Sequence, residues 1–323
     1  MLNAAIVGLG WWGKRLVEAS AGSRRIRFTR AVTLEPELAS DFAAEWKLAL
    51  GTSFKDVLAD SAIEALVLAT PHTRHRAQVE AAAAAGKHIY CEKPFALSKA
   101  DARAALDACA RAGVTVAVGH HFRLMPSMQT LREWAQSGAL GTIMHAEGNY
   151  SHDWLASQST DHWRAAPGES RAGGMTGMGI HVLDCFRHLI GPARRVSALS
   201  KRRALDLPTG DTTAALIEFE NGATGTLATT LKTPFVWRVA IFGSDAWMES
   251  TSETRAVLYR TGQEPEIRER PANNHLGLNL EEFAAAALER KPFAIDPASI
   301  LQTVAALEAV FRSADADGAW QEV

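Results

Sequence analysis

Short apolar runs alternate with amphipathic stretches along the first 120 residues. Residues 3–8 (NAAIVG), 64–69 (EALVLA) and 114–119 (VTVAVG) are almost entirely apolar, as expected of strands buried on both faces. Between them, residues 74–86 and 101–113 have apolar positions at helical spacing and end at a glycine. Strands that alternate with helices at this spacing predict a Rossmann-like, doubly wound parallel sheet.

The pattern changes after residue 121. A helical stretch at 128–138 precedes several runs that alternate between apolar and polar residues, and Asn221-Gly222 within them is typical of a hairpin turn. These runs predict a large, mostly antiparallel open sheet, and amphipathic stretches at 279–291 and 297–315 predict two final helices. We therefore expect an α/β protein with one domain at 1–121 and a second at 122–323.

A glycine motif directly follows the first predicted strand. Gly8, Gly10 and Gly13 form G-x-G-x-x-G between that strand and an amphipathic helix. The first glycine suits a tight turn, the second admits a pyrophosphate and the third lets helix and strand pack closely. The helix N-terminus would present free N–H groups to the phosphates. One of Trp11 and Trp12 is a candidate to shield the cofactor, but packing is the better explanation for these residues.

The tip of the second predicted strand does not decide between NAD and NADP. An acid that binds the ribose hydroxyls is expected about 20 residues after the glycines. Here the tip has Thr33, while Glu35 follows one or two residues late and no arginine follows to hold a 2′-phosphate. The carboxyl ends of the other strands carry Thr70, Pro71 and His72, then Glu92 and Lys93, and then His120 and Arg123, which predicts one ligand crevice.

Cys91-Glu92-Lys93-Pro94 and motifs over most of the chain resemble those of the Gfo/Idh/MocA oxidoreductases. ATPHTRH (69–75), AGKHIYCEKPFALS (85–98) and VGHHFRLMP (118–126) follow one another as in that family, and HWRAAP (162–167) precedes a glycine-rich segment that ends in IHVLD (180–184). The resemblance implies a Rossmann dinucleotide-binding domain at 1–121 and a substrate-binding and oligomerisation domain at 122–323. It also implies hydride transfer between a nicotinamide and a carbinol or carbonyl carbon. It makes Lys93 the active-site lysine and His181 the general acid/base, and it places Glu92 and His75 beside the nicotinamide.

Elementary chemistry supports these two catalytic assignments. Oxidation of an alcohol needs a base for the hydroxyl proton, and the ordinary pKa of histidine, ~6.5, suits that task at neutral pH. A lysine beside the same oxygen stabilises the developing negative charge. On the helix that carries His181, Asp184 is expected to orient the histidine, with His188 further from the chemistry.

Several polar residues on predicted loops are candidates for substrate binding. They are His120, Arg123, His152, Trp163 and Arg164, together with Lys93, Gly177 and His181. His152, Asp153, Asp161 and His162 match no common zinc spacing, so we expect no metal.

Gly177 stands where many members of the family carry an aspartate, four residues before the histidine. The loss of that carboxylate leaves a more cationic site around Lys93, His181, Arg164 and Arg123. We therefore expect an anionic substrate such as a carboxylated ring diol or a sugar acid. Met175 and Met178 favour a partly apolar ring over a fully hydroxylated sugar.

Composition restricts the remaining possibilities. The net charge of −2 predicts no nucleic-acid partner, and no apolar run is long enough to span a membrane. Three cysteines without paired spacing fit a reducing, cytoplasmic location. The open sheet predicts a homodimer or homotetramer. Two other functions stay open: a non-catalytic nucleotide or sugar sensor, and a lyase or hydrolase that recycles its NAD internally.

Overall fold

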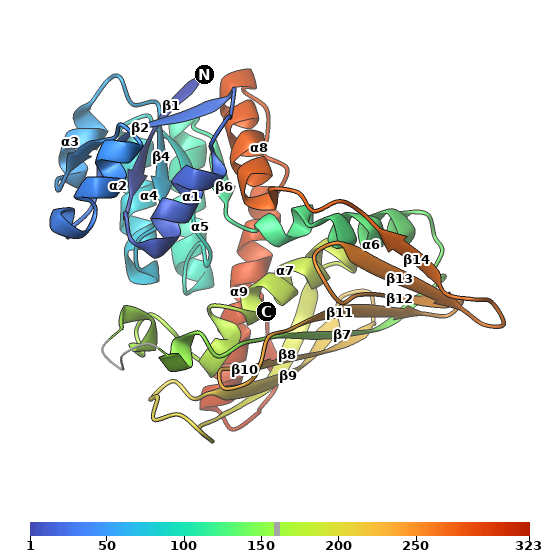
Figure 1. Ribbon diagram of the computed structural model, residues 1–323. Coiled ribbons are helices and arrows are strands. Elements are labelled where there is room, and N and C mark those ends of the chain that lie inside the picture. The colour runs from blue at the N-terminus through green and yellow to red at the C-terminus, as the bar shows by residue number, and fades with distance from the viewer. Residues whose placement is uncertain (158–161) are drawn as a thin grey trace. The chain divides into compact units, whose positions relative to one another are not determined.

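The computed structural model describes residues 1–157 and 162–323 and divides them into two compact units (Figure 1). The first unit contains Met1–His121 and Asn274–Ile300, and the second contains Phe122–Asn273 and Leu301–Val323. The predicted division had assigned all of 122–323 to the second domain, whereas Asn274–Ile300 groups with the N-terminal residues. The functions predicted for the two domains stay predictions.

The first unit is built on a parallel six-stranded sheet of order β3-β2-β1-β4-β5-β6. Its strands are β1 (Leu2–Val7), β2 (Ile26–Val32), β3 (Ala49–Gly51), β4 (Ala65–Leu68), β5 (His88–Cys91) and β6 (Val116–Val118). The connecting helices are α1 (Trp11–Ala19), α2 (Ser40–Glu45), α3 (Phe54–Ala59), α4 (His75–Ala84) and α5 (Lys99–Ala112). β1, β4 and β5 are almost fully buried, because helices cover both faces of a parallel sheet.

Helix α8 (His275–Glu289) comes late in the chain but packs against α1, β1, β2 and β5 of the first unit (Figure 1). Its Asn279 accepts a 2.8 Å hydrogen bond from the buried hydroxyl of Tyr90. At its N-terminus the Asn274 side chain accepts from the Gly277 amide and donates to the Ala19 carbonyl. This one asparagine thus caps α8 and joins it to the end of α1.

The second unit contains a nine-stranded sheet of order β14-β13-β12-β11-β7-β10-β9-β8-β15. β7 and β10 are parallel and the other neighbouring pairs are antiparallel. The strands are β7 (Ile143–Ser151), β8 (Ala193–Lys201), β9 (Thr212–Phe219), β10 (Thr224–Thr230), β11 (Val236–Gly243), β12 (Ala246–Ser250), β13 (Arg255–Arg260), β14 (Glu266–Glu269) and β15 (Gln321–Glu322). The helices are α6 (Pro126–Gln136), α7 (Gly179–Leu189) and most of α9 (Pro297–Asp315). The predicted fold class is confirmed, and the turn between β9 and β10 contains Asn221 and Gly222, whose φ is +86°.

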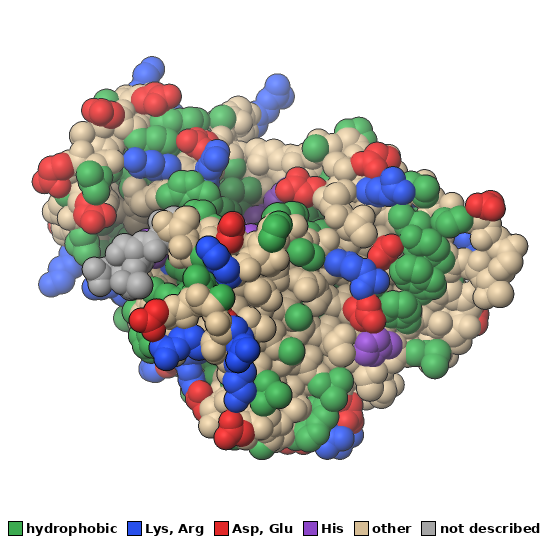
Figure 2. All heavy atoms as spheres, turned by 60° about the horizontal axis from the view of Figure 1, so that its bottom comes forward, with side chains coloured by type: hydrophobic (Ala, Val, Ile, Leu, Met, Phe, Trp, Pro, Cys, Tyr) green, Lys and Arg blue, Asp and Glu red, His purple; other side chains and the backbone are tan. Residues whose placement is uncertain are grey.

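The two faces of this sheet differ. α7 lies against β7 and β10, where a Cβ on Gly148 would come within 2.3 Å of Val182 on the helix. Gly148 therefore lets α7 approach the strand closely. On the opposite face Leu199 and Leu216 are exposed and line a groove of about 480 Å³. On the face of the molecule drawn in Figure 2, hydrophobic side chains lie among charged ones. Oligomerisation through this face stays a prediction. Among the described residues, no helix is long and apolar enough to cross a membrane.

Candidate active-site residues

The glycine motif forms a narrow turn between β1 and α1. Gly8 has φ +93°, and a Cβ there would lie 2.5 Å from the Ala69 carbonyl oxygen. A Cβ on Gly13 would lie 1.9 Å from the Gly8 carbonyl oxygen, whereas one on Gly10 would meet nothing within 4 Å. No side-chain hydrogen bond from Gly10 caps the start of α1, and the N-terminus of a helix attracts anions. The residues present therefore fit a dinucleotide pyrophosphate.

The loop after β2 carries two acids and no arginine or lysine. Thr33 is buried and its hydroxyl accepts a 3.2 Å hydrogen bond from the Glu35 amide. Glu35 and Glu37 are exposed, as is Leu34 between them and the strand. Lys14 of α1 reaches the end of this loop. Its ammonium donates to the Leu38 carbonyl and lies over the Phe42 ring.

The segments after β4 and β5 are tied together by His75. Its ring is fully buried, with Nδ1 2.8 Å from the Pro94 carbonyl oxygen and Nε2 3.0 Å from the Thr70 carbonyl oxygen. A neutral imidazole donates to only one of these carbonyls and an imidazolium to both. This bracing is visible in the structure, whereas the nicotinamide contact expected of His75 stays a prediction. His72 is buried and lies edge-on to His75.

Lys93 follows Glu92 at the end of β5. The Lys93 amide donates a 3.2 Å hydrogen bond to Glu92 Oε2, and the Lys93–Pro94 peptide bond is cis. Glu92 is buried beside Gly119, where a Cβ would lie 2.6 Å from Glu92 Oε1. The absence of a side chain at 119 therefore makes room for this carboxylate at the ends of β5 and β6.

His121, which follows β6, packs between Trp12 of α1 and His275 of α8. Its Nδ1 lies 2.8 Å from Nδ1 of His275, and the two rings stack with centroids 4.9 Å apart. Trp12 lies on its other side, at 5.7 Å between ring centroids. Burial, followed by the charges of His275, Lys93 and His120, lowers the pKa of His121 well below its ordinary value. The packing of Trp12 is thus explained by His121, while exposed Trp11 is the better placed of the two to meet a ligand.

In the second unit, aromatic rings surround His181 near the start of α7. The His181 ring stacks on Phe122 with a centroid distance of 4.0 Å, and Tyr150 lies edge-on at 6.0 Å. Trp237 of β11 packs edge-on against both Phe122 and Tyr150. We call Phe122, Tyr150 and Trp237 the aromatic box. Sequence reasoning missed all three residues. Alternation along β7 and β11 shows on which face of the sheet Tyr150 and Trp237 lie, but not which side chains they contact, and Phe122 lies outside the strands.

Tyr150 adds a polar group to the aromatic box. Burial, and to a smaller extent the charge of Glu253, raises the pKa of its hydroxyl to about 12. The hydroxyl is therefore a neutral hydrogen-bond donor at physiological pH. Tyr150 also lies edge-on to His152, a predicted substrate residue, with ring centroids 5.4 Å apart.

Arg123 and Asp184 form a buried bidentate ion pair. Arg123 Nε and Nη2 donate to the two carboxylate oxygens at 2.7 and 2.6 Å, and both side chains are buried. Arg123 Nη1 lies 3.3 Å from Nδ1 of His188. Burial, and next the charges of Arg123 and Arg132, lowers the pKa of His188 to about 4. The role expected of Asp184 in orienting His181 and the substrate contact expected of Arg123 stay predictions.

The loop before α7 holds Arg164 among aromatic rings. Its guanidinium lies over Trp163 at 4.1 Å and over Trp154 at 5.6 Å, and its amide donates to His162 Nδ1. Asp161, part of the acid–histidine group considered for a metal, lies outside the described residues. Within residues 1–157 and 162–323, no group of three or more His, Cys, Asp and Glu side chains is arranged to hold a metal ion.

Gly177 differs from the glycines around it. A Cβ on Gly174 would come within 2.9 Å of Thr229 Cβ, and one on Gly179 within 2.4 Å of Met175 Sδ. A Cβ on Gly177 would meet nothing within 4 Å, and its φ lies outside the left-handed region. The backbone therefore accepts a side chain at the position where the family often has an aspartate.

These features agree with comparisons to known proteins. Residues 2–120 match the Gfo/Idh/MocA oxidoreductase family, NAD-binding Rossmann fold, and residues 128–249 match a C-terminal domain of the same family. The chain belongs to the Gfo/Idh/MocA family. The predicted family is thus confirmed, and with it the prediction of an NAD(P)-dependent oxidoreductase.

Two curated relatives and one solved structure illustrate the range of the family. Levoglucosan dehydrogenase of Pseudarthrobacter phenanthrenivorans is 29% identical over 71% of this chain and 67% of its own length. The 2,7-anhydro-N-acetylneuraminate hydratase of Escherichia coli is 31% identical over 59% of this chain and 50% of its own length. A structure of levoglucosan dehydrogenase with NADH and levoglucosan superposes with a TM-score of 0.89 at 23% identity, covering 100% of this chain and 99% of that one.

Proposed function

We propose that this chain transfers hydride between a nicotinamide dinucleotide and a hydroxyl-bearing carbon of a cyclic sugar derivative. The observation that carries this proposal is the placement of His181, which is buried and stacked on Phe122 within the aromatic box. Aromatic rings suit the apolar face of a sugar ring, while the Tyr150 hydroxyl and the histidine suit its oxygen atoms. The N-terminus of α1 in the first unit, which no side chain of Gly10 caps, supports the dinucleotide part of the proposal.

The roles of the two catalytic candidates rest on the family resemblance. Bound dinucleotide would supply the hydride acceptor or donor. His181 would accept the hydroxyl proton during oxidation and return it during reduction. The ammonium of Lys93 would stabilise negative charge on the substrate oxygen. Loss of either side chain is therefore expected to lower kcat by about 10²- to 10⁴-fold.

For the substrate we propose an anhydro sugar or related ring compound that carries a carboxylate. One relative is named for levoglucosan and the other for 2,7-anhydro-N-acetylneuraminate, and a neuraminate is a sugar acid. In this chain Gly177 supplies no negative charge, and Met178 packs with Leu207 and Tyr150 in a small apolar cluster. A compact, partly apolar ring with an anionic group complements such surroundings better than a neutral polyol does.

We further propose that NAD is preferred over NADP. Glu35 and Glu37 would repel a 2′-phosphate, and residues 33–39 contain no arginine or lysine that would bind it. Lys14 is the one competing cation that we identify near this loop in the described part of the chain. Its ammonium is bonded to the Leu38 carbonyl and faces an aromatic ring, which favours a packing role.

One experiment separates the proposed function from its alternatives. The protein is incubated with NAD⁺ or NADP⁺ and a panel of neutral and carboxylated anhydro sugars. Reduced-nicotinamide absorbance and loss of the sugar are followed in parallel. Growth of absorbance with sugar loss supports a dehydrogenase. Sugar loss without growth of absorbance instead supports internal hydride recycling, and a hydratase among the relatives makes this alternative worth testing. Binding without turnover supports a sensor.

A further inference from the structure

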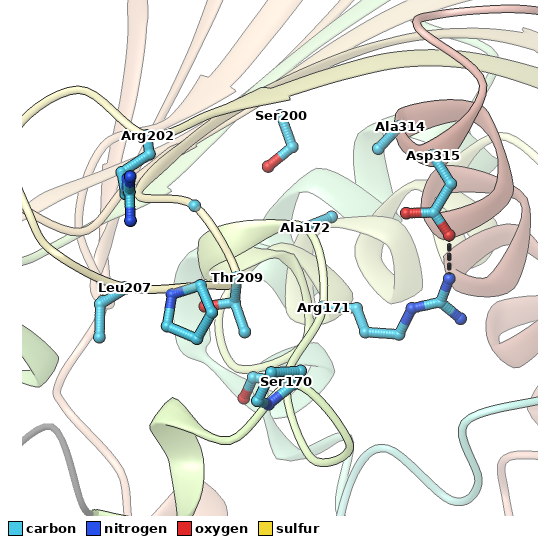
Figure 3. A pocket seen from close by; sticks show the side chains of 12 residues that line it. Ser170, Arg171, Ala172, Ser200, Arg202, Leu207, Thr209, Ala314 and Asp315 are labelled. Atoms are coloured by element: carbon cyan, nitrogen blue, oxygen red, sulfur yellow. Dashed lines mark hydrogen bonds and ion pairs between the residues drawn. The ribbon is translucent and has the colours of Figure 1, made fainter.

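A cavity in the second unit has a lining different from the aromatic box, although Leu207 of that lining also belongs to the apolar cluster that Tyr150 contacts. Its volume is about 440 Å³, within the range of small-molecule pockets, which starts at ~300 Å³. Three segments line it: the loop before α7, the end of β8 with the loop that follows, and the end of α9 (Figure 3). None of His181, Phe122, Tyr150 and Trp237 is among its lining residues.

Two guanidinium groups lie at this cavity, each paired with an exposed acid. Arg171 pairs with Asp315 (Figure 3), and its guanidinium lies over the Phe311 ring at 5.0 Å. Arg202 pairs with Asp206 at 2.8 Å. The carboxylates of Asp315 and Asp206 are 66% and 94% exposed. Exposed pairs of this kind contribute only ~0–1 kcal/mol, so an incoming oxyanion can replace the carboxylates at little cost.

Hydroxyl groups complete the lining of the cavity. Thr209 Oγ1 is buried and has no hydrogen-bond partner among the described residues, and the Ser170 hydroxyl also has none there. The third hydroxyl, on Ser200, is bonded to Thr213 at 2.8 Å. Two guanidiniums and two available hydroxyls suit a ligand that has both an oxyanion and hydroxyl groups.

The backbone behind these side chains is firmly held. Ala172 has φ +51°, and its carbonyl accepts a 2.8 Å hydrogen bond from Thr213. The Gly173 amide donates to the Thr209 carbonyl at 2.7 Å, which joins the two loops that line the cavity. A non-glycine residue keeps a positive φ only where its surroundings fix it, and such positions are frequent at ligand sites.

Asp211 fixes the loop that carries Arg202 and Thr209. Its carboxylate accepts hydrogen bonds from the amides of Arg203, Ala204 and Leu205. These amides hold the pKa of Asp211 below its ordinary value although burial acts in the opposite direction. The loop therefore does not need a ligand to adopt its shape, which lowers the entropic cost of binding.

We propose that this cavity is a second ligand site for a small hydroxylated oxyanion, a sugar acid or a sugar phosphate. The ligand's oxyanion binds Arg202 in place of Asp206, and its hydroxyl groups bond to Ser170 and Thr209, while Arg171 borders the cavity on the side of Asp315 (Figure 3). The proposal does not depend on the reaction that the protein catalyses. Ala172 lines the cavity and precedes α7 and His181 by a short segment, so occupancy is positioned to influence that segment.

The test is isothermal titration calorimetry of the full chain with three probes: gluconate, glucose 6-phosphate and neutral glucose. At probe concentrations up to about 10 mM we expect gluconate, glucose 6-phosphate or both to bind, and glucose not to bind. The two anions distinguish a carboxylate source from a phosphate source. Binding of glucose equal to that of the anions, or no binding by either anion, would overturn the proposal.

Four variants locate the binding. Arg202→Gln and Thr209→Val each remove one ligand contact and should weaken anion binding, by about tenfold or more for the arginine. Arg194→Gln, an exposed arginine paired with Glu218 and absent from the lining, is the matched control and should bind as the unchanged protein does. His181→Ala should also retain binding. Anion binding that His181→Ala abolishes and Arg202→Gln leaves intact belongs to the aromatic box and refutes a second site.

Discussion

The imidazole of His181 lies nearly parallel to the ring of Phe122, with their planes inclined by 19° and their centroids 4.0 Å apart. Stacking of this kind fixes the tilt of the histidine without using either ring nitrogen. The orientation of the proposed acid/base therefore depends on a hydrophobic side chain from the segment that follows β6. This relationship leads to a direct test.

Phe122→Leu should lower kcat by about tenfold while leaving the fold intact. The substitution keeps apolar volume but removes a stacked aromatic partner, a contribution of roughly 0.5–1.5 kcal/mol. Steady-state kinetics of kcat and its pH profile provide the measurement. Phe242→Leu is the matched control, because Phe242 stacks on Trp247 at 5.3 Å in a different part of the sheet. Equal losses in the two variants would show that the effect is general destabilisation.

Asp184→Asn should destabilise the protein by about 3–5 kcal/mol, because it leaves the guanidinium of Arg123 buried without its counter-charge. Urea unfolding measures the change. Glu218→Gln, which disrupts the more exposed pairs with Arg194 and Arg195, should change stability by about 1 kcal/mol or less. A small effect of Asp184→Asn would mean that the buried pair is dispensable.

His188 should make stability depend on pH on the acidic side of neutrality. Its pKa is lowered to about 4 in the folded protein, mainly by burial, against an ordinary value of 6.5. The folded state thus prefers the neutral ring. The contribution of the neutral ring to stability is fully present above the unfolded pKa and is lost as pH falls through the folded pKa, by about 3 kcal/mol in total.

His188→Gln removes this titration and should flatten the dependence of unfolding free energy on pH between about 6.5 and 4. Unfolding is measured in urea at several pH values. His145→Gln, at a histidine on β7 whose ring contacts Thr224, serves as the control for the substitution itself. An unchanged slope in His188→Gln would show that other groups cause the acid sensitivity.

Replacing Glu35 and Glu37 by glutamine should narrow the preference for NAD⁺ over NADP⁺ by about tenfold, since two charges near the 2′-position are removed. Quenching of tryptophan fluorescence during titration with each dinucleotide measures affinity independently of turnover. Lys14→Gln should leave NADP⁺ binding unchanged. A loss of NADP⁺ affinity in that variant would instead assign the 2′-phosphate to Lys14.

Gly177→Asp should fold normally and shift selectivity from carboxylated to neutral substrates, by about tenfold or more in kcat/KM. Open space around the position removes any steric objection. The measurement compares kcat/KM for a neutral and a carboxylated member of the same sugar pair. If activity on the acid is unchanged while neutral polyols are also turned over, the anionic-substrate proposal fails.

The fold was largely predictable, because strand and helix periodicities in this chain are regular and the glycine motif is positioned by local geometry. At Gly8 and at Gly13 a carbonyl oxygen lies too close to leave room for a side chain. In one case the carbonyl belongs to the same turn, and in the other it follows an adjacent strand. The position of α8 was missed. Its amphipathic pattern predicts a helix, but a pattern does not identify the sheet against which that helix packs.

The surroundings of His181 were predictable only in part. The histidine itself was found through a motif, whereas Phe122, Tyr150 and Trp237 converge from positions about 30 to 115 residues apart in the chain. The cavity lined by Arg171 and Arg202 was likewise not predictable from the sequence. Arg171 and Asp315 meet across 144 positions, a separation over which periodicity carries no information.

The unequal crowding of the glycines before α7 has a consequence for how this protein could change over time. Gly174 and Gly179 are confined by Thr229 and Met175, so substitutions there would disturb the approach to the helix. Gly177 is sterically free to change while its neighbours keep the backbone in place. Charge beside the histidine can thus be gained or lost in one substitution, and relatives with different substrates can share a single scaffold.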